Sequence, residues 1–184
     1  MKTAYIEKST GNARDGGWAK SLDLDGVGRI VVGTGPGSFA GVRAALAFAV
    51  GYSLGKPCEV LGLPSPCATA AEFFSRQGNA GVRQLAVVGD ARRGMYWAAL
   101  FDGMSLVHGV FQTDADGLYG AVPDDCMVVT PDAARIDGFL RDMFGSRYAG
   151  GVLPTAEGLR AFAEANPSAL ERNPRPLYLN PAVR

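Results

Sequence analysis

Apolar runs separated by glycine and proline mark the elements of this 184-residue chain. The run at 29–33 (RIVVG) is short and continuous, which predicts a buried strand. A glycine-rich turn follows at 33–38, and residues 39–54 then predict a helix. Strand, tight glycine turn and helix is a common order in phosphate-binding sites, so this stretch is the first candidate for chemistry.

Three further helices are predicted from their apolar spacing and end signals. Residues 62–78 predict a helix with Ser65 as N-cap and Gly78 after its last turn. Residues 130–145 predict another, with Thr130 as the cap and Gly145 at the end. A weaker helix is predicted near 155–167, and the remaining proline-broken tail reads as extended.

The central part of the chain has the pattern of a hairpin. Residues 84–90 and 95–102 predict two antiparallel strands joined by ARRG, with Gly94 in a conformation that residues with a Cβ avoid. Residues 105–112 would extend this meander, and 126–130 predict a buried strand. Because strands and helices alternate around the hairpin, we expect an α/β protein with helices on the faces of a mixed sheet.

The helix after the glycine turn is apolar on every side, since Arg43 is its only charge between Val42 and Leu54. We expect all of its faces to be covered, either by its own domain or by a second protein, and the pattern leaves both alternatives open. Small side chains would let another helix approach closely. The candidate interface residues are Val42, Ala45, Leu46, Ala49 and Val50.

The glycine turn itself matches neither standard phosphate motif. It has no lysine at the place that a P-loop requires, and Ser38 stands where a dinucleotide fingerprint has its third glycine. Two interpretations stay open: the glycines allow a sharp turn and close helix–sheet packing, or the backbone contacts a phosphate or ribose, such as that of ATP or ADP. The candidate loop residues are Gly33, Gly35, Pro36, Gly37 and Ser38.

Composition adds mainly exclusions. The 18 basic and 18 acidic residues are evenly spread, so no basic patch points to unaided nucleic-acid binding. Three cysteines without metal-ligand spacing favour buried thiols of a cytoplasmic protein, and no apolar run is long enough for a membrane span. The single histidine, His108, favours a packed or surface role over catalysis, so we expect no metal site and no catalytic residue.

Three segments resemble the TsaB family, also called YeaZ. GTGPGSFAGVRAALAFAVG resembles the family hallmark G-x-G-P-G-S-F-T-G-x-R-x-G. GDARRGMYWAAL resembles its D-A-R-x-x-E-V-Y-x-A segment, and PLYLNP its closing P-x-Y-L-R motif. The resemblance implies the fold of the actin-like, sugar-kinase and Hsp70 (ASKHA, ribonuclease H-like) superfamily, to which this glycoprotease-like group (peptidase M22) belongs.

The resemblance also implies a function. The family acts in the synthesis of N6-threonylcarbamoyladenosine in tRNA, as a dimerising, non-catalytic partner of the TsaD subunit, together with the ATPase TsaE. By this resemblance we expect a TsaD-type and a TsaE-type partner, a homodimer, no membrane contact, and tRNA contact only through the complex. The alternatives are a nucleotide-dependent carbamoyl or acyl transferase that uses the glycine turn, or a degenerate homologue that only self-associates.

The opening of the chain departs from the family pattern. The family begins with a strand ending in I-D-T-S, followed by a hairpin and a long helix. Here Glu7 and Lys8 stand in place of the aspartate and the threonine, and too few residues precede 29–33 for the hairpin and helix. We therefore expect a truncated N-terminal lobe at 1–80 and a C-terminal α/β lobe at 81–184.

Overall fold

The structure is a computed structural model that describes residues 1–10, 16–76, 79 and 81–179. These residues form two compact units. The first contains residues 1–68 and 154–178, and the second contains residues 69–153 with Leu179. The expected lobe boundary near residue 80 differs from this division. Residues 154–178 belong with the first unit because β9 (Glu171–Arg172) pairs with β3 (Glu59–Leu63), and α5 (Ala156–Ala165) packs on β1 (Lys2–Ile6).

The first unit is built on a four-stranded sheet in the order β1-β2-β3-β9. β1 pairs in parallel with β2 (Val27–Gly33), β2 pairs in parallel with β3, and β9 is antiparallel to β3. The strand predicted at 29–33 is therefore confirmed and begins two residues earlier, at Val27. All three parallel strands end at the same edge, where the glycine turn leaves β2.

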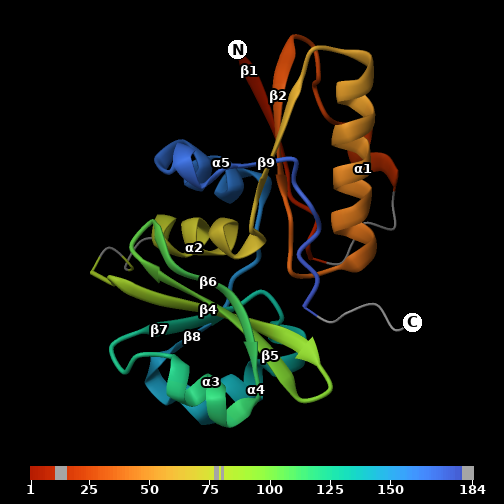
Figure 1. The fold of residues 1–184 in the computed structure, drawn as a ribbon. Coiled ribbons are helices and arrows are strands. Elements are labelled where there is room, and N and C mark those ends of the chain that lie inside the picture. The colour runs from red at the N-terminus through yellow and green to blue at the C-terminus, as the bar shows by residue number, and fades with distance from the viewer. Residues whose placement is uncertain (11–15, 77–78, 80, 180–184) are drawn as a thin grey trace. The chain divides into compact units, whose positions relative to one another are not determined.

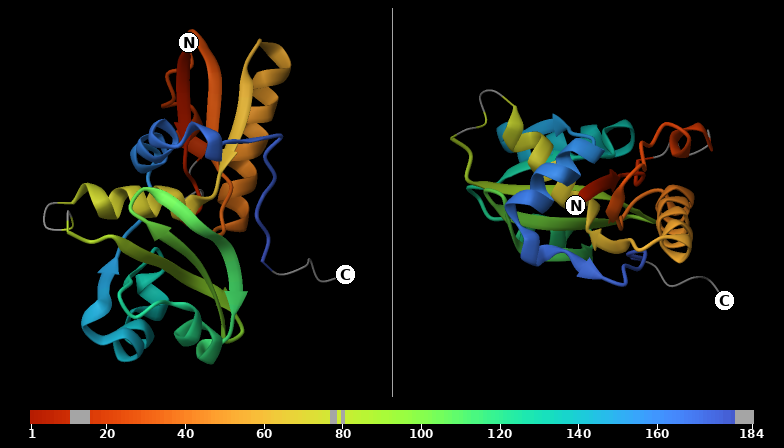
Figure 2. Two further views of the ribbon diagram at one scale, coloured as in Figure 1. Left: turned by 60° about the vertical axis from the view of Figure 1, so that its left-hand side comes forward. Right: turned by 90° about the horizontal axis from the view of Figure 1, so that it is seen from above.

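Helices cover both faces of this sheet, as Figures 1 and 2 show, with α1 (Phe39–Gly55) on one face and α5 on the other. Ile30 and Val32 of β2 face α1, and alternation along the strand turns Val31 the other way. Two short 3₁₀ turns, η1 (Gly16–Ala19) and η3 (Pro167–Ala169), lie in the connections of this unit.

The second unit contains a five-stranded mixed sheet in the order β6-β5-β4-β7-β8. Its strands are β4 (Gln84–Arg92), β5 (Met95–Asp102), β6 (Ser105–Thr113), β7 (Met127–Thr130) and β8 (Tyr148–Gly151). The predicted hairpin is confirmed, since β4 and β5 pair antiparallel and Gly94 has a φ of 73°. Two positive φ values were not foreseen, those of Arg92 and Arg93.

The helices of the second unit are α3 (Ala115–Ala121) and α4 (Ala133–Phe144), and α4 is followed by the 3₁₀ turn η2 (Gly145–Arg147). Leu118 of α3 and Leu140 of α4 pack with Val88 and Val128 in one core beneath the sheet. α2 (Ser65–Ser75) begins in the first unit and ends in the second. None of the helices in these described ranges is long and apolar enough to cross a bilayer.

Several predicted helix ends need correction. Ser65 is the first residue of α2 rather than its cap, and the expected stop at Gly78 lies outside the described residues. Thr130 ends β7 instead of capping α4, because its hydroxyl accepts the Asp132 N–H at 3.0 Å and the helix begins at Ala133. The sequence patterns also missed α3 and β8, which are short and rich in alanine or glycine.

Candidate functional site

The candidate glycine loop lies where β1, β2 and β3 end, and its backbone is tied to its neighbours on both sides. The Thr34 N–H donates to the Leu63 carbonyl at 2.9 Å, and the Gly35 N–H donates to Ser65 Oγ at 3.0 Å. The Gly35–Pro36 peptide is cis, and the Leu177 N–H donates to the Thr34 carbonyl at 2.9 Å. The loop is thus held between the end of β3, the start of α2 and the C-terminal segment.

The segment after β1 occupies the other side of this loop. The Ser38 N–H, at the start of α1, donates to the Ser9 carbonyl at 2.5 Å. A β-carbon on Gly37 would overlap this carbonyl, and one on Gly41 would overlap the carbonyl of Lys8. The glycines therefore permit close packing of residues 8–9 against the loop and the first turn of α1, which is the packing interpretation of the sequence.

This geometry bears directly on the expected phosphate contact. An anion at a helix N-terminus is bound by backbone N–H groups that lack an intramolecular acceptor. In this loop the N–H groups of Thr34, Gly35 and Ser38 already donate within the chain. A phosphate bound by these three groups would have to displace Leu63, Ser65 or Ser9 from them.

A buried carboxylate lies beneath the same loop. Glu7 follows β1 directly, and its Oε1 accepts the Ser9 N–H at 2.7 Å. Its Oε2 is buried and has no hydrogen-bond partner among the described residues. Burial raises the pKa of Glu7 above its ordinary value, and hydrogen bonding by Ser9 and Ser65 opposes this only in part. The sequence marked Glu7 as a departure from the family pattern but gave no sign that it would be buried.

The structure corrects the predicted interface on α1. Val42, Ala45, Leu46 and Ala49 are buried against the sheet of their own unit, so they are not a free surface. Val50 is 46% exposed and points away from that core. Within the described residues the helix is therefore covered on one side only, so its own domain does not bury every face, and cover by a second protein, the other alternative from the sequence, stays a prediction.

The opposite face of α1 is exposed and almost entirely apolar. Leu54 is 85% exposed and Phe39 is 58% exposed. The single charged side chain of this face, Arg43, lies over the Phe39 ring at 4.0 Å and donates through Nε to the Tyr178 hydroxyl at 2.5 Å. We call this surface the outer face of α1; its residues are Phe39, Ala40, Arg43, Ala44, Ala47, Val50, Gly51 and Leu54.

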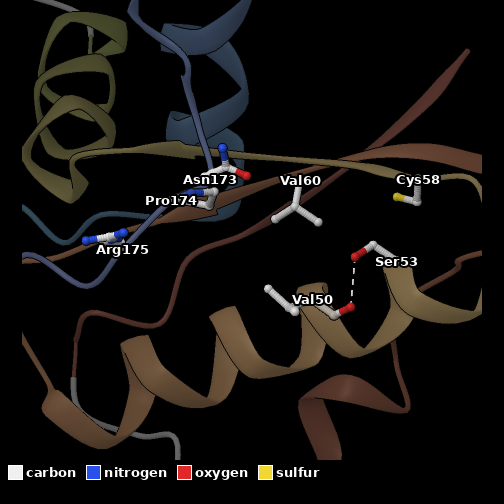
Figure 3. Close-up of a pocket in the computed structure, with 7 residues that line it drawn as sticks. All are labelled: Val50, Ser53, Cys58, Val60, Asn173, Pro174 and Arg175. Atoms are coloured by element: carbon white, nitrogen blue, oxygen red, sulfur yellow. Dashed lines mark hydrogen bonds between the residues drawn. The ribbon is translucent and has the colours of Figure 1, made fainter.

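A groove of about 440 Å³ lies between the end of α1, β3 and the segment after β9. Figure 3 shows Val50 and Val60 on facing walls, with the Ser53 hydroxyl donating to the Val50 carbonyl at 2.8 Å. Cys58 and Arg175 complete its polar lining, and neither was singled out as a site residue from the sequence. Through Val50 the groove adjoins the outer face of α1.

In the second unit, charged side chains meet at the β4–β5 hairpin. Asp90 forms ion pairs with Arg135 at 3.0 Å and with Arg92 at 3.3 Å, and its backbone N–H donates to Asp132 at 3.0 Å. This network explains Asp90 and Arg92 as structural residues of the turn. His108 is exposed on β6, where its Nδ1 lies 2.9 Å from the carbonyl of the next residue.

Comparison with known proteins bears on the family. The family model described as "TsaD: tRNA N6-adenosine threonylcarbamoyltransferase" matches residues 19–109, about half of the chain. The structure of YeaZ from Pseudomonas aeruginosa has a TM-score of 0.72 to this chain at 18% identity, over 96% of this chain and 100% of that one. Over residues 19–109 the chain is thus similar to the TsaD family, and its fold is that of YeaZ.

A second solved structure, of a protein described as similar to peptidase YeaZ from Pseudomonas aeruginosa, agrees with the first. Its TM-score is 0.71 at 18% identity, over 97% of this chain and 99% of that one. The expected fold class is therefore confirmed: this chain has the mixed α/β architecture of YeaZ.

Curated relatives are similar over part of their length. Uncharacterized proteins of Mycobacterium bovis and Mycobacterium tuberculosis are 32% identical to this chain over 114 residues, which is 61% of the chain and 50% of each relative. The chain thus spans about half the length of the curated relatives that it matches.

Proposed function

We propose that this chain is the TsaB-type partner of a TsaD-type subunit in the N6-threonylcarbamoyladenosine modification of tRNA. The observation that carries the proposal is the outer face of α1. It runs the length of a 17-residue helix and includes Phe39, Val50 and Leu54, each close to half exposed or more. The similarity to the TsaD family and to YeaZ supports the proposal that such a surface has a partner.

The outer face of α1 exposes apolar side chains to water. A surface helix ordinarily turns charged and polar residues to solvent, whereas the outer face of α1 has Arg43 as its one charge. Contiguous exposed apolar surface on a soluble protein marks an interaction site. Alanines at 44 and 47 keep the centre of the face flat, so that a helix of the partner could approach closely.

A supporting role fits the glycine loop better than catalysis does. The N–H groups of Thr34, Gly35 and Ser38 donate within the chain, which disfavours the alternative of a nucleotide-dependent transferase that binds phosphate through these three groups. On this proposal a TsaE-type ATPase joins the same assembly, and tRNA meets the chain only within it. A homodimer through the same face would form when the TsaD-type subunit is absent.

Co-expression tests the proposal. The tagged chain is expressed with the TsaD-type protein of the same organism, and the purified material is separated by size-exclusion chromatography. We expect a stable complex that Ala47→Glu abolishes. The matched control is Ala161→Glu, which places the same charge on an exposed alanine of α5 in the same unit and should leave the complex intact.

Three results would count against this assignment. If the complex does not form, or if it forms equally well with Ala47→Glu, the outer face of α1 is not its interface. If the chain dimerises through this face but never retains the TsaD-type protein, it is a homologue that only self-associates.

A further inference from the structure

Ser9 connects the buried Glu7 carboxylate to the glycine loop. Ser9 makes two backbone hydrogen bonds in opposite directions. Its N–H donates to Glu7 Oε1 at 2.7 Å, and its carbonyl accepts from the Ser38 N–H at 2.5 Å. The Glu7 carboxylate is thus linked, through a single residue, to the N-cap of α1.

The second carboxylate oxygen makes this link sensitive to charge. Glu7 Oε2 is buried without a hydrogen-bond partner among the described residues, and it lies against Gly33, where a β-carbon would overlap it. A neutral carboxylic acid fits such a position better than an ion, because burial removes the water of the ionised carboxylate and hydrogen bonding by Ser9 and Ser65 offsets this loss only in part.

We propose that Glu7 is a proton-controlled latch that closes residues 7–9 over the glycine loop. In the closed state the carboxyl is protonated and Ser9 holds the Ser38 N–H. Ionisation favours an open state, in which Oε2 reaches water and the Ser9–Ser38 hydrogen bond is broken. Because Ser38 is the N-cap of α1, the latch controls the order of the first turn of α1, where Phe39 begins the outer face.

Among the residues that the structure describes, no basic side chain pairs with Glu7. From α2, Cys67 interacts electrostatically with Glu7, and the pKa of its thiol is raised by burial and further by Glu171 of β9 and by Glu7 itself. From its own segment, the Lys8 ammonium lies 5.3 Å from the centroid of the Trp18 ring. The end of β2 contributes Gly33, and α2 contributes the Ser65 hydroxyl, and neither group titrates in this range.

Amide hydrogen exchange measured by NMR on the isolated full chain tests the latch without any partner. The readout is the protection of the Gly35 and Ser38 amides, corrected at each pH for the intrinsic exchange rate. Between the ordinary pKa range of glutamate and the raised pKa of Glu7, we expect protection to fall by about tenfold per pH unit and then to level off. Glu7→Gln should abolish this step.

The matched control is Glu59→Gln, which makes the same change on a carboxylate of β3 in the same sheet and should preserve the step. The proposal is overturned if the wild-type step is absent or if Glu7→Gln retains it. If Glu7→Gln does not fold, the proposal is tested on the wild-type chain alone, by comparing the pH dependence of two of its amides. A step at Ser38 that is missing from the Val87 amide of β4 supports the latch, and a step of equal size at both overturns it.

Discussion

Gly33, at the end of β2, lies against the buried carboxylate of Glu7, the residue after β1. The backbone of Gly33 thus packs directly on the Glu7 side chain. A β-carbon at position 33 would also come within 2.9 Å of Ser65 Oγ. Position 33 therefore requires glycine for lack of space, and its backbone conformation does not impose that choice. This contact joins the ends of neighbouring parallel strands beneath the loop that leads into α1.

Gly33→Ala should therefore lower the free energy of unfolding by about 1–3 kcal/mol, the usual cost of forcing an extra carbon into a packed site. Urea unfolding followed by circular dichroism measures the change. The control is Gly51→Ala on the exposed side of α1, where no atom lies within 4 Å of the new carbon. That substitution should raise stability by about 0.5–1 kcal/mol, since alanine is the better helix former. Equal effects of the two substitutions would contradict this assignment.

The raised pKa of Glu7 gives stability a defined pH dependence. The unfolded chain ionises Glu7 at its ordinary pKa, while the folded chain holds the proton to higher pH. The contribution to stability is therefore fully present below the ordinary pKa and is lost as pH rises through the raised folded value. Each pKa unit of difference corresponds to about 1.4 kcal/mol.

Glu7→Gln should consequently be more stable than the wild type at neutral pH and should lack this part of the pH dependence. Urea midpoints measured across the acidic to neutral range, with both proteins in the same buffers, provide the comparison. Parallel curves for the two proteins would show that Glu7 titrates alike in the folded and unfolded chains.

The turn between β4 and β5 carries strain that a substitution can relieve. Arg92 pairs with Met95, which leaves Arg93 and Gly94 as a two-residue loop with φ values of 56° and 73°. Positive φ at both positions is the type I′ geometry, for which Asn-Gly is the preferred sequence. Arg93→Asn should therefore raise the free energy of unfolding by about 1 kcal/mol. Arg93→Val should lower the free energy of unfolding, because a β-branched side chain tolerates a positive φ less well than arginine does. Thermal unfolding of the two variants gives the comparison.

The sequence was sufficient for the elements whose signals are local. Continuous apolar runs gave the positions of β2, β4 and β5, and the glycine at 94 correctly indicated a turn with positive φ. α3 and β8 were missed because seven and four residues with several glycines or alanines leave no periodic signal. The two-residue strand β9 could not be found either, since its pairing with β3 depends on residues far away in the sequence.

The candidate site was predicted less completely, and for a different reason. Sequence identified the glycine loop and the apolar helix, but apolar residues on every side of α1 could not show which side the sheet would cover. The burial of Glu7 was equally invisible, because it arises from residues 33 and 65 meeting it in space. Composition thus indicates an apolar helix, while only the fold shows which of its faces the sheet leaves exposed.

Two adjacent alanines of α1 lie on opposite sides of the helix. Ala45 is fully buried against the sheet, while Ala44 is exposed on the outer face. Ala45→Arg and Ala49→Glu would thus place charges in a core without partners, and each should lower stability by more than about 4 kcal/mol and unfold the first unit. The sequence placed both residues in the candidate interface, and their burial against the sheet reverses that expectation.

Ala44→Arg should instead leave the chain folded, with a change in stability within roughly 0.5 kcal/mol, because the new charge points into water. Sedimentation at high protein concentration then reports association, and circular dichroism reports folding. On the proposed function, the wild type self-associates when no partner is present and Ala44→Arg stays monomeric. A folded Ala45→Arg variant would show that the two faces of α1 are assigned the wrong way round. A wild type that remains monomeric at every concentration, and that retains no TsaD-type protein, would mean that the outer face has no partner.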